Sequence, residues 1–216
     1  MLLTAIKTLI VARLRSPECS PKQTLRRGVY SFFFAVSLTF AGCGGKPFEV
    51  KTRADLPPPS ASVASAQSSR ITIQAEALRD EDYLNDTFDA NLILAGVLPV
   101  RLKLTNGSQE PVDLNKSRFE IKAANGHSYK ASDPKKAFKR LVAYYEISTY
   151  SKPGYRESQE AFTGYALDLS KPLGAGETRE GLVFFVVPDT VANAQELSMV
   201  ASRLDQRGAP IELSLH

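Results

Sequence analysis

The sequence predicts a mainly β protein: an antiparallel β-sandwich over residues 70–216, with one α-helix inserted at about residues 133–147. Short segments in which apolar and polar side chains alternate recur along this region, and alternation is typical of strands with one buried face. Asn-Gly pairs at 106–107 and 125–126 separate them, and Asn-Gly is a strong signal for a tight turn. Seven or eight short strands with regular turn signals favour a sandwich.

The segment 96–105 gives the clearest strand. Val100, Leu102 and Leu104 alternate there with charged side chains, so the apolar side chains share one face. The same pattern, with turn residues as boundaries, predicts the other strands at 71–76, 111–114, 118–123, 162–169, 180–187, 197–204 and 210–215, the last two as a closing hairpin.

One stretch has a helical period instead. Asp133 precedes Pro134, and Asp caps free N–H groups while Pro suits the first helical position. In this helix, apolar side chains recur at i, i+3, i+4 and i+7 and form one stripe: Phe138, Leu141, Val142 and Tyr145.

Two other segments have weaker signals. The acidic stretch 80–89 is predicted to be a short helix or a loop at the domain edge, and 151–160 is predicted to be a loop.

Upstream of this domain lies a segment with the features of a secretory signal. Arg26 and Arg27 precede an uncharged apolar run at 29–41, which ends near Cys43. As a helix this run would be roughly 20 Å long. The hydrocarbon core of a bilayer is about 30 Å thick, so a permanent membrane span is not predicted.

The end of this segment, Phe40-Ala41-Gly42-Cys43, resembles the lipobox of bacterial lipoproteins, although the family usually has Leu where this chain has Phe40. The resemblance implies that a diacylglyceryl group is attached to the Cys43 thiol and that the chain is cleaved before it. Gly44, rather than Asp, implies the outer membrane if the cell is Gram-negative. The alternative is an ordinary secreted protein cleaved after Ala41, with Cys43 as a free thiol.

Three regions are therefore predicted: a signal peptide at 1–42, a lipidated Cys43 with a flexible linker at 43–69, and the sandwich domain at 70–216. The linker is rich in Pro, Ser and Ala and has too little apolar surface to offset the entropy of ordering it. Residues 1–24 add a second apolar and basic patch before a complete signal. Either the true start codon lies further downstream, or the basic region of the signal is long.

Removal of the signal changes the charge of the protein. Six basic residues and one acidic residue precede Cys43, so the formal charge falls from +4 to −1 in the mature chain. A near-neutral domain gives no electrostatic argument for a nucleic-acid partner, and none is predicted. Cys19 also leaves with the signal, so the mature chain has one cysteine and no intramolecular disulfide.

Two stretches resemble the telokin-like, immunoglobulin-like domains of bacterial lipoproteins. In those domains a strand ends in a Thr-Asn turn, and a later Gly-Glu-Thr segment leads into an apolar strand that ends in Val-Pro. The matching residues here are Thr105-Asn106, Pro111-Val112, Gly176-Glu177-Thr178 and Val187-Pro188, within about 97–189. The resemblance implies an immunoglobulin-like sandwich in which the helix is an insertion, and it brings no catalytic residues.

Few residues suit catalysis or metal binding. His127 and His216 are the only histidines, and a Ser-His-Asp site would have to use His127, which follows a turn. The chain has no nucleophile-elbow, phosphate-loop or zinc-protease motif, so we expect no enzyme activity and no cofactor. Four acidic side chains offer oxygen ligands for Ca²⁺ but lack the spacing of an EF-hand, so a solvated acidic face is expected: Asp80, Asp82, Asp86 and Asp89.

Aromatic and basic residues around the inserted helix are the candidate binding surface. Five of the eight tyrosines lie within 22 residues, and tyrosine suits surfaces that are half buried and half wet. The alternative is that these rings fix the helix to the sandwich. The basic helix face is either solvated or contacts anionic lipid, peptidoglycan or an acidic partner. The candidate residues are Lys135, Lys136, Lys139, Arg140, Tyr144, Tyr145, Tyr150, Tyr155 and Tyr165.

These observations predict a protein that is attached to the membrane of the cell envelope by lipid, and whose sandwich serves as a binding or assembly module with an envelope protein as partner. The alternative is a carrier of a small ligand or metal ion, which needs a pocket between the sheets or at 80–89. A hydrolytic enzyme is a third hypothesis, and it needs a carboxylate and a serine within reach of His127.

Overall fold

The computed structural model describes residues 45–215 except 54–55, 57, 61–62, 69, 195 and 205–208. The signal segment, Cys43 and His216 lie outside the described residues, and so do the predictions made for them. Everything below concerns the single compact unit that contains the described residues.

The described residues form eight strands in one folded antiparallel sheet, in the order β1-β2-β3-β6-β5-β4-β7-β8. Adjacent strands pair antiparallel throughout. Their bounds are β1 Ala64–Gln67, β2 Ile71–Ala77, β3 Val97–Asn106, β4 Arg118–Ala123, β5 Ser128–Ser132, β6 Thr178–Val186, β7 Leu197–Ser202 and β8 Ile211–Leu215.

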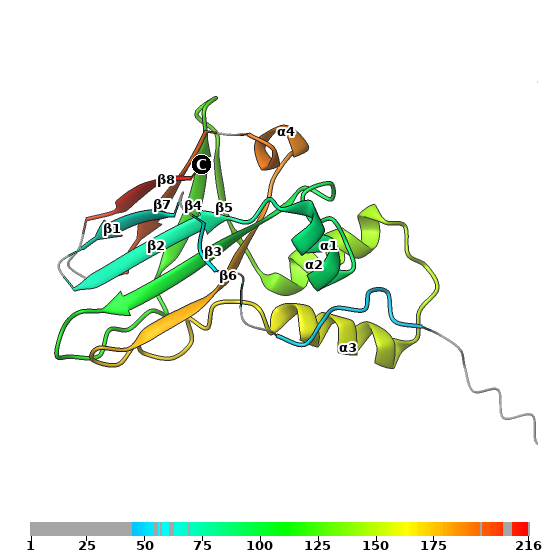
Figure 1. Cartoon of the computed structure of the whole chain (residues 1–216), viewed down its shortest axis with the longest axis horizontal. Coiled ribbons are helices and arrows are strands. Elements are labelled where there is room, and N and C mark those ends of the chain that lie inside the picture. The colour runs from blue at the N-terminus through cyan, green and yellow to red at the C-terminus, as the bar shows by residue number, and fades with distance from the viewer. Residues whose placement is uncertain are drawn as a thin grey trace, which may run out of the picture. The chain divides into compact units, whose positions relative to one another are not determined.

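The sheet folds into two layers (Figure 1). One layer contains β1, β2, β3 and β6, and the other contains β4, β7 and β8. Strand β5 joins them, because its first three residues pair with β4 and its last two, Ala131 and Ser132, pair with Phe185 and Phe184 of β6. This arrangement confirms the predicted antiparallel β-sandwich.

The core lies between the inner faces of the two layers. In β2 the side chains of Ile71 and Ile73 are fully buried and alternate with partly exposed polar neighbours. Leu197 and Met199 of β7 are buried in the same alternating way. The period-two pattern in the sequence thus marks the buried face, as predicted.

The described residues include four helices: α1 Glu81–Phe88, α2 Pro134–Tyr144, α3 Lys152–Thr163 and α4 Asp189–Ala192. The predicted helix is α2, and Asp133 caps it by accepting a hydrogen bond from the Lys135 amide at 2.7 Å. Helices α1, α2 and α3 gather at one end of the sandwich (Figure 1). None of the described helices is both long and apolar enough to cross a membrane.

Helix α3 corrects the prediction of a loop at 151–160, of a strand at 162–169 and of a single helix in the domain. Its buried positions are Gly154, Ser158 and Phe162, spaced by four residues. Because two of these three are small or polar, the helical period carried almost no hydrophobic signal. Ser151 caps the helix by accepting a hydrogen bond from the Gly154 amide at 3.0 Å.

Two strand predictions also differ from the structure. Of the predicted strand 111–114 only one bridge forms, between Val112 and Leu173. Strand β5 was not predicted, because its side chains are mostly polar and exposed and show no alternation. The other predicted strands, including the closing pair β7 and β8, are present with boundaries within a few residues.

The predicted flexible linker at 43–69 is wrong for two described segments. Ala64–Gln67 forms β1 and pairs with β2 at the edge of the sheet. Gly45–Arg53, which we call the strap, packs across the helical end, with the Phe48 side chain only 4% exposed. Burial of that one ring and a series of backbone hydrogen bonds order a segment that its composition alone predicts to be loose.

Candidate functional site

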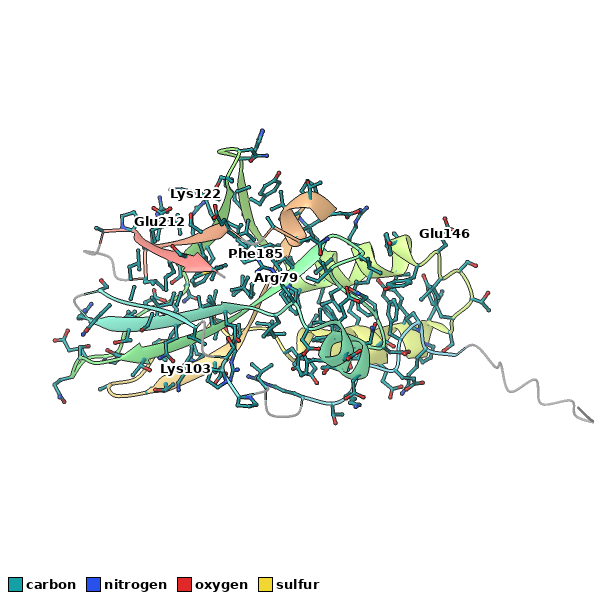
Figure 2. The ribbon with its side chains drawn as sticks, turned by 45° about the horizontal axis from the view of Figure 1, so that its top comes forward. Arg79, Lys103, Lys122, Glu146, Phe185 and Glu212 are labelled. Carbon is teal, nitrogen blue, oxygen red and sulfur yellow. The ribbon has the colours of Figure 1, made fainter. Side chains whose placement is uncertain are left out.

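The helical end of the sandwich holds most of the residues predicted as a binding surface. We define it as α1, α2, α3 and the strap that crosses them. In Figure 1 the strap, coloured blue, begins near the loop between α2 and α3 and runs beside α3. In Figure 2 Glu146, in the α2–α3 loop, lies far from the labelled strand residues Lys103 and Lys122.

The beginning of the strap is held against α3. The Gly45 carbonyl accepts a hydrogen bond from the Ser151 amide at 3.1 Å. Lys46 forms an ion pair with Glu157 at 2.7 Å, and this contact raises the pKa of the ammonium group. The Phe48 carbonyl accepts from the buried Ser158 hydroxyl at 2.6 Å.

The remainder of the strap is fixed by contacts with α1 and the sheet. The Lys51 amide donates to the Thr87 carbonyl at 2.9 Å, and the Tyr165 hydroxyl donates to the Lys51 carbonyl at 3.2 Å. The Arg53 guanidinium donates to the Glu180 carbonyl of β6 at 2.7 Å. The strap therefore ties α3, α1 and the sheet together along its length.

An aromatic cluster fills the space beneath the strap. Phe162 stacks on Phe184 of β6 at 4.6 Å between ring centroids and contacts Phe138 of α2 at 5.6 Å. Phe48 of the strap meets Phe138 at 5.9 Å and Tyr145 at 5.8 Å, each edge to face. Such pairs contribute about 0.5–1.5 kcal/mol beyond the burial of their area.

The five candidate tyrosines have different positions. Tyr165 is only 1% exposed and belongs to the core, so its assignment to a binding surface is wrong. Tyr155 is half-buried between Phe138 and Tyr150, and burial raises the pKa of its hydroxyl. Tyr144, Tyr145 and Tyr150 keep 36–43% of their surface exposed. Tyr155 and Tyr165 thus pack the helices against the sandwich, and the other three tyrosines remain partly exposed.

The basic side chains of α2 are exposed on the same end. Lys135, Lys136 and Lys139 point away from the buried stripe of the helix. Arg140 is exposed too, but its Nε donates to the Ala95 carbonyl at 3.0 Å, just before β3 begins. That bond fixes α2 to the sheet, so Arg140 has a structural role in addition to its charge.

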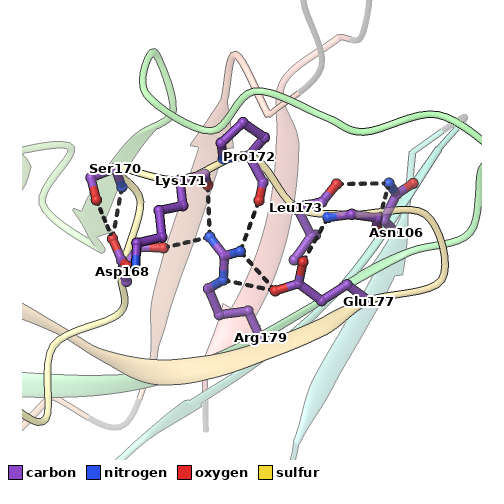
Figure 3. A network of polar contacts seen from close by, with 9 residues as sticks. Asn106, Asp168, Ser170, Lys171, Pro172, Leu173, Glu177 and Arg179 are labelled. Carbon is purple, nitrogen blue, oxygen red and sulfur yellow. Dashed lines mark hydrogen bonds and ion pairs between the residues drawn. The ribbon is translucent and has the colours of Figure 1, made fainter.

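A second polar cluster lies at the opposite end of β3 and β6 (Figure 3). The Asn106 side chain is fully buried and donates to the carbonyls of Leu173 and Gly174 at 3.0 and 2.9 Å. The Arg179 guanidinium donates to the Lys171 carbonyl at 2.7 Å and to the Glu177 carboxylate at 2.7 Å. The cluster closes the 168–177 loop against the end of β3.

Two carboxylates of this cluster have depressed pKa values. The Ser170 hydroxyl and amide, both donating to Asp168, lower the pKa of that carboxyl below its ordinary 3.8. The Gly174 amide, followed by Arg179, lowers the pKa of Glu177 below its ordinary 4.5. Both groups are thus held as anions by local hydrogen bonds, which suits a structural role. Glu177 and Asn106 are the residues on which the family resemblance depended.

The acidic stretch 80–89 has structural roles. Asp80 caps α1 by accepting from the Tyr83 amide, and Asp86 pairs with Lys51 of the strap at 2.5 Å. Asp89 ends the helix in the left-handed conformation and accepts from the Glu49 amide. Among the described residues no three His, Cys, Asp or Glu side chains converge to hold a metal ion.

A cavity of about 260 Å³ opens between β6 of the first layer, β4 of the second and the joining strand β5. It lies where β5 and β6 share only two residue pairs, so the layers separate there. Its wall is mainly apolar, with Phe119, Leu182 and Phe184, and Lys130 and Glu120 also line it. His127 is an exposed residue of the β4–β5 turn and does not line this cavity.

Gly181 of β6 allows another side of this cavity to form. A Cβ at this position would lie 2.6 Å from the Leu167 Cα, because the 165–167 segment runs directly against β6. The Leu167 amide and the Leu182 carbonyl form a hydrogen bond of 2.9 Å there. The missing side chain therefore lets the segment after α3 close one side of the cavity.

A buried ion cluster lies on the outer face of the first layer. Arg101 of β3 pairs with Glu180 of β6 and lies 3.7 Å from the Glu76 carboxylate of β2. The Ser60 amide donates to Glu76 at 3.0 Å, so the segment before β1 covers this cluster. Packing of the sheet therefore accounts for this cluster, in which Arg101 lies between two carboxylates and beneath the segment before β1.

No protein-family model matches the chain, and no curated protein matches it. Solved structures similar to it include a conserved hypothetical protein from Bacillus anthracis (12% identity, 68% of this chain and 91% of the other, TM-score 0.35). Others are the yjhA protein from Bacillus subtilis (10%, 70% and 96%, 0.37) and an uncharacterized β-sandwich protein from Clostridium difficile (11%, 76% and 99%, 0.36). At these values the likenesses say nothing about function.

Proposed function

We propose that the protein is a lipoprotein of the bacterial cell envelope, acylated on Cys43, whose sandwich acts as a binding or assembly module through its helical end. The observation that carries the proposal is the sequence 26–43, in which paired arginines, a short apolar run and Ala41-Gly42 precede Cys43. The resemblance to telokin-like domains of lipoproteins supports it. The outer membrane is the proposed location in a Gram-negative cell.

The anchor is tested by metabolic labelling with an alkyne analogue of palmitate, followed by mass spectrometry of the mature N-terminus. We expect labelling of the wild-type protein and of Cys19→Ser, because Cys19 lies in the segment that is removed. Cys43→Ser should lose the label and accumulate with its signal attached. Labelling that persists in Cys43→Ser, or a mature chain that begins before residue 43, would refute the anchor.

The role of the helical end is tested by lysine footprinting in native envelopes and on the purified protein. Lys139 and Lys152 lie at the helical end, while Lys103 and Lys122 lie on β3 and β4, and all four are exposed. We expect acetylation of Lys139 and Lys152 to be reduced in envelopes relative to the purified protein, and that of Lys103 and Lys122 to be unchanged. Equal protection of all four would contradict a contact surface at this end.

A carrier of a small apolar ligand is the second candidate, favoured by the cavity of about 260 Å³ between the layers. Ligand sites are typically apolar clefts with a few polar groups, and this cavity is slightly smaller than their usual range of about 300–1,000 Å³. Ala131 lines the cavity and is exposed, so Ala131→Phe should fill it without disturbing the core.

The matched control is Ala209→Phe, at an exposed alanine that does not line the cavity. Binding of a medium-chain fatty acid, measured by displacement of an apolar fluorescent probe, should be lost in Ala131→Phe and kept in Ala209→Phe. No displacement from the wild-type protein would end this candidate.

A further inference from the structure

Very little chain separates an acylated Cys43 from the start of the strap. Only two peptide units separate Cys43 from Gly45. Consecutive Cα atoms are about 3.8 Å apart, so the Cys43 Cα lies within about 7.6 Å of the Gly45 Cα. The Gly45 carbonyl is itself bonded to the Ser151 amide at the start of α3. A flexible linker of 26 residues would reach roughly 25–30 Å, and the strap removes that freedom.

The residues around this attachment point suit a lipid surface. The headgroup region on each side of a bilayer is about 5–8 Å deep, which is comparable to the reach from Cys43 to Gly45. Tyr150 directly precedes the Ser151 that holds Gly45, and Tyr144 ends α2. Both rings are exposed, and tyrosine is enriched at membrane interfaces because its ring is apolar and its hydroxyl is wet. Tyr145 is fixed to the domain, because its hydroxyl is bonded to the Asn91 backbone and its ring packs on Phe48.

Positive charge is concentrated on α2 and the start of α3, whereas α1 at the same end carries Glu81, Asp82 and Asp86. Residues 134–156 contain six Lys or Arg side chains and one acidic side chain, Glu146, although the mature chain as a whole is close to neutral. Glu157, the next acidic residue along α3, is paired with Lys46 of the strap. Basic side chains beside a membrane anchor are attracted to anionic lipid headgroups.

We infer that the α2–α3 side of the helical end lies directly on the phospholipid bilayer surface, with Tyr144 and Tyr150 in the headgroup layer and the basic face of α2 near anionic lipid. The strap sets this orientation, because it converts a lipid anchor at Cys43 into a fixed contact of the domain with the membrane. The inference rests on the proposed acylation of Cys43 and names the bilayer as the partner of the helical end.

The absence of tryptophan from the sequence makes a direct test available. Tyr150→Trp places a single fluorescent reporter at the helical end. Gln109→Trp places one at an exposed position beyond the far end of β3, and a strand of this length separates the two ends by about 30 Å. Each acylated full-length mature protein is reconstituted into vesicles of phosphatidylethanolamine and phosphatidylglycerol that contain a headgroup nitroxide lipid.

We expect the nitroxide lipid to quench at least half of the Tyr150→Trp emission and less than a tenth of the Gln109→Trp emission. Equal quenching of the two variants would overturn the inference, as would an emission in Tyr150→Trp that aqueous iodide quenches as strongly with vesicles as without. A protein or peptidoglycan partner at this surface would give that second result, because the reporter then stays in water when only lipid is present.

Two further measurements separate this inference from the acylation on which it rests. If Cys43 is not acylated, the protein will fail to float with the vesicles, and the proposed anchor itself is wrong. If it floats but Tyr150→Trp is not quenched, the anchor stands and the membrane contact is wrong. Insertion of twenty Gly and Ser residues between Gly44 and Gly45 should reduce the quenching at least threefold, and unchanged quenching would overturn the role of the strap.

Discussion

Phe48→Ala tests whether the strap is part of the folded domain. The ring is 4% exposed and meets Phe138 and Tyr145 edge to face. Replacement of a buried Phe by Ala typically costs about 3–5 kcal/mol, because transfer free energy is lost and a cavity remains. The lower end applies here, since a strap at the edge of the core can relax toward the cavity. We therefore expect a loss of about 3 kcal/mol in the free energy of unfolding.

The assay is urea unfolding of the mature chain carrying Cys43→Ser, followed by circular dichroism. With a slope near 2 kcal/mol/M, a loss of about 3 kcal/mol lowers the midpoint by about 1.5 M. The control is Leu94→Ala, whose side chain is 47% exposed and whose loss should cost less than about 0.5 kcal/mol. If Phe48→Ala has no more effect than Leu94→Ala, the strap is a loose linker and the orientation argument built on it fails.

Three other predictions follow from the packing. Gly154→Ala should destabilise by about 1–3 kcal/mol in the same assay, because its Cβ would lie 2.8 Å from the Gly45 carbonyl oxygen. Gly45→Ala meets nothing within 4 Å and should be neutral, so equal effects would contradict this contact. Asn106→Ala should cost about 2–4 kcal/mol in calorimetry, since the carbonyls of Glu110, Leu173 and Gly174 lose the hydrogen bonds that this side chain donates, and a loss below 1 kcal/mol would argue against the Figure 3 cluster. Depressed pKa values at Asp168 and Glu177 mean that the folded state binds fewer protons than the unfolded state near pH 4. The urea midpoint should therefore fall as the pH drops from about 5 to 3, and it should fall less steeply in Glu177→Gln. A midpoint that rises over this pH range would contradict the prediction.

Much of the sheet was predictable because its strands obey one strong rule. In β2, β4 and β7 the buried side chains alternate with more exposed ones, so the pattern in the sequence is the same as the pattern of burial. In β3 this holds only over residues 102–106, because the first six residues of the strand are all buried. Strand β5 has no such face, because it joins the two layers at a corner and is mostly exposed. No local pattern identifies a strand whose position is set by its neighbours.

The helical end was harder to predict because the residues that define it lie far apart in the sequence and meet only in the fold. The α3 stripe consists of Gly154, Ser158 and Phe162, and hydrophobicity marks only the last of these. The strap contains one large apolar ring, and composition favours disorder for such a segment. Phe48 becomes decisive only when Phe138 and Tyr145, about a hundred residues later, form a pocket for it. The tyrosine cluster was the one available signal, and it could not separate the buried Tyr165 from the exposed Tyr150.

The two ends of the sandwich differ in how their polar and aromatic side chains are used. The residues behind the family resemblance, Asn106 and Glu177, lie in the Figure 3 cluster, where each has hydrogen bonds that close a loop. Hydrogen bonds within the fold thus account for both side chains. At the other end, Tyr144 and Tyr150 are exposed. Because the strap begins at Gly45 beside Ser151, next to Tyr150, a test of the proposed anchor at Cys43 also bears on the proposed contact surface.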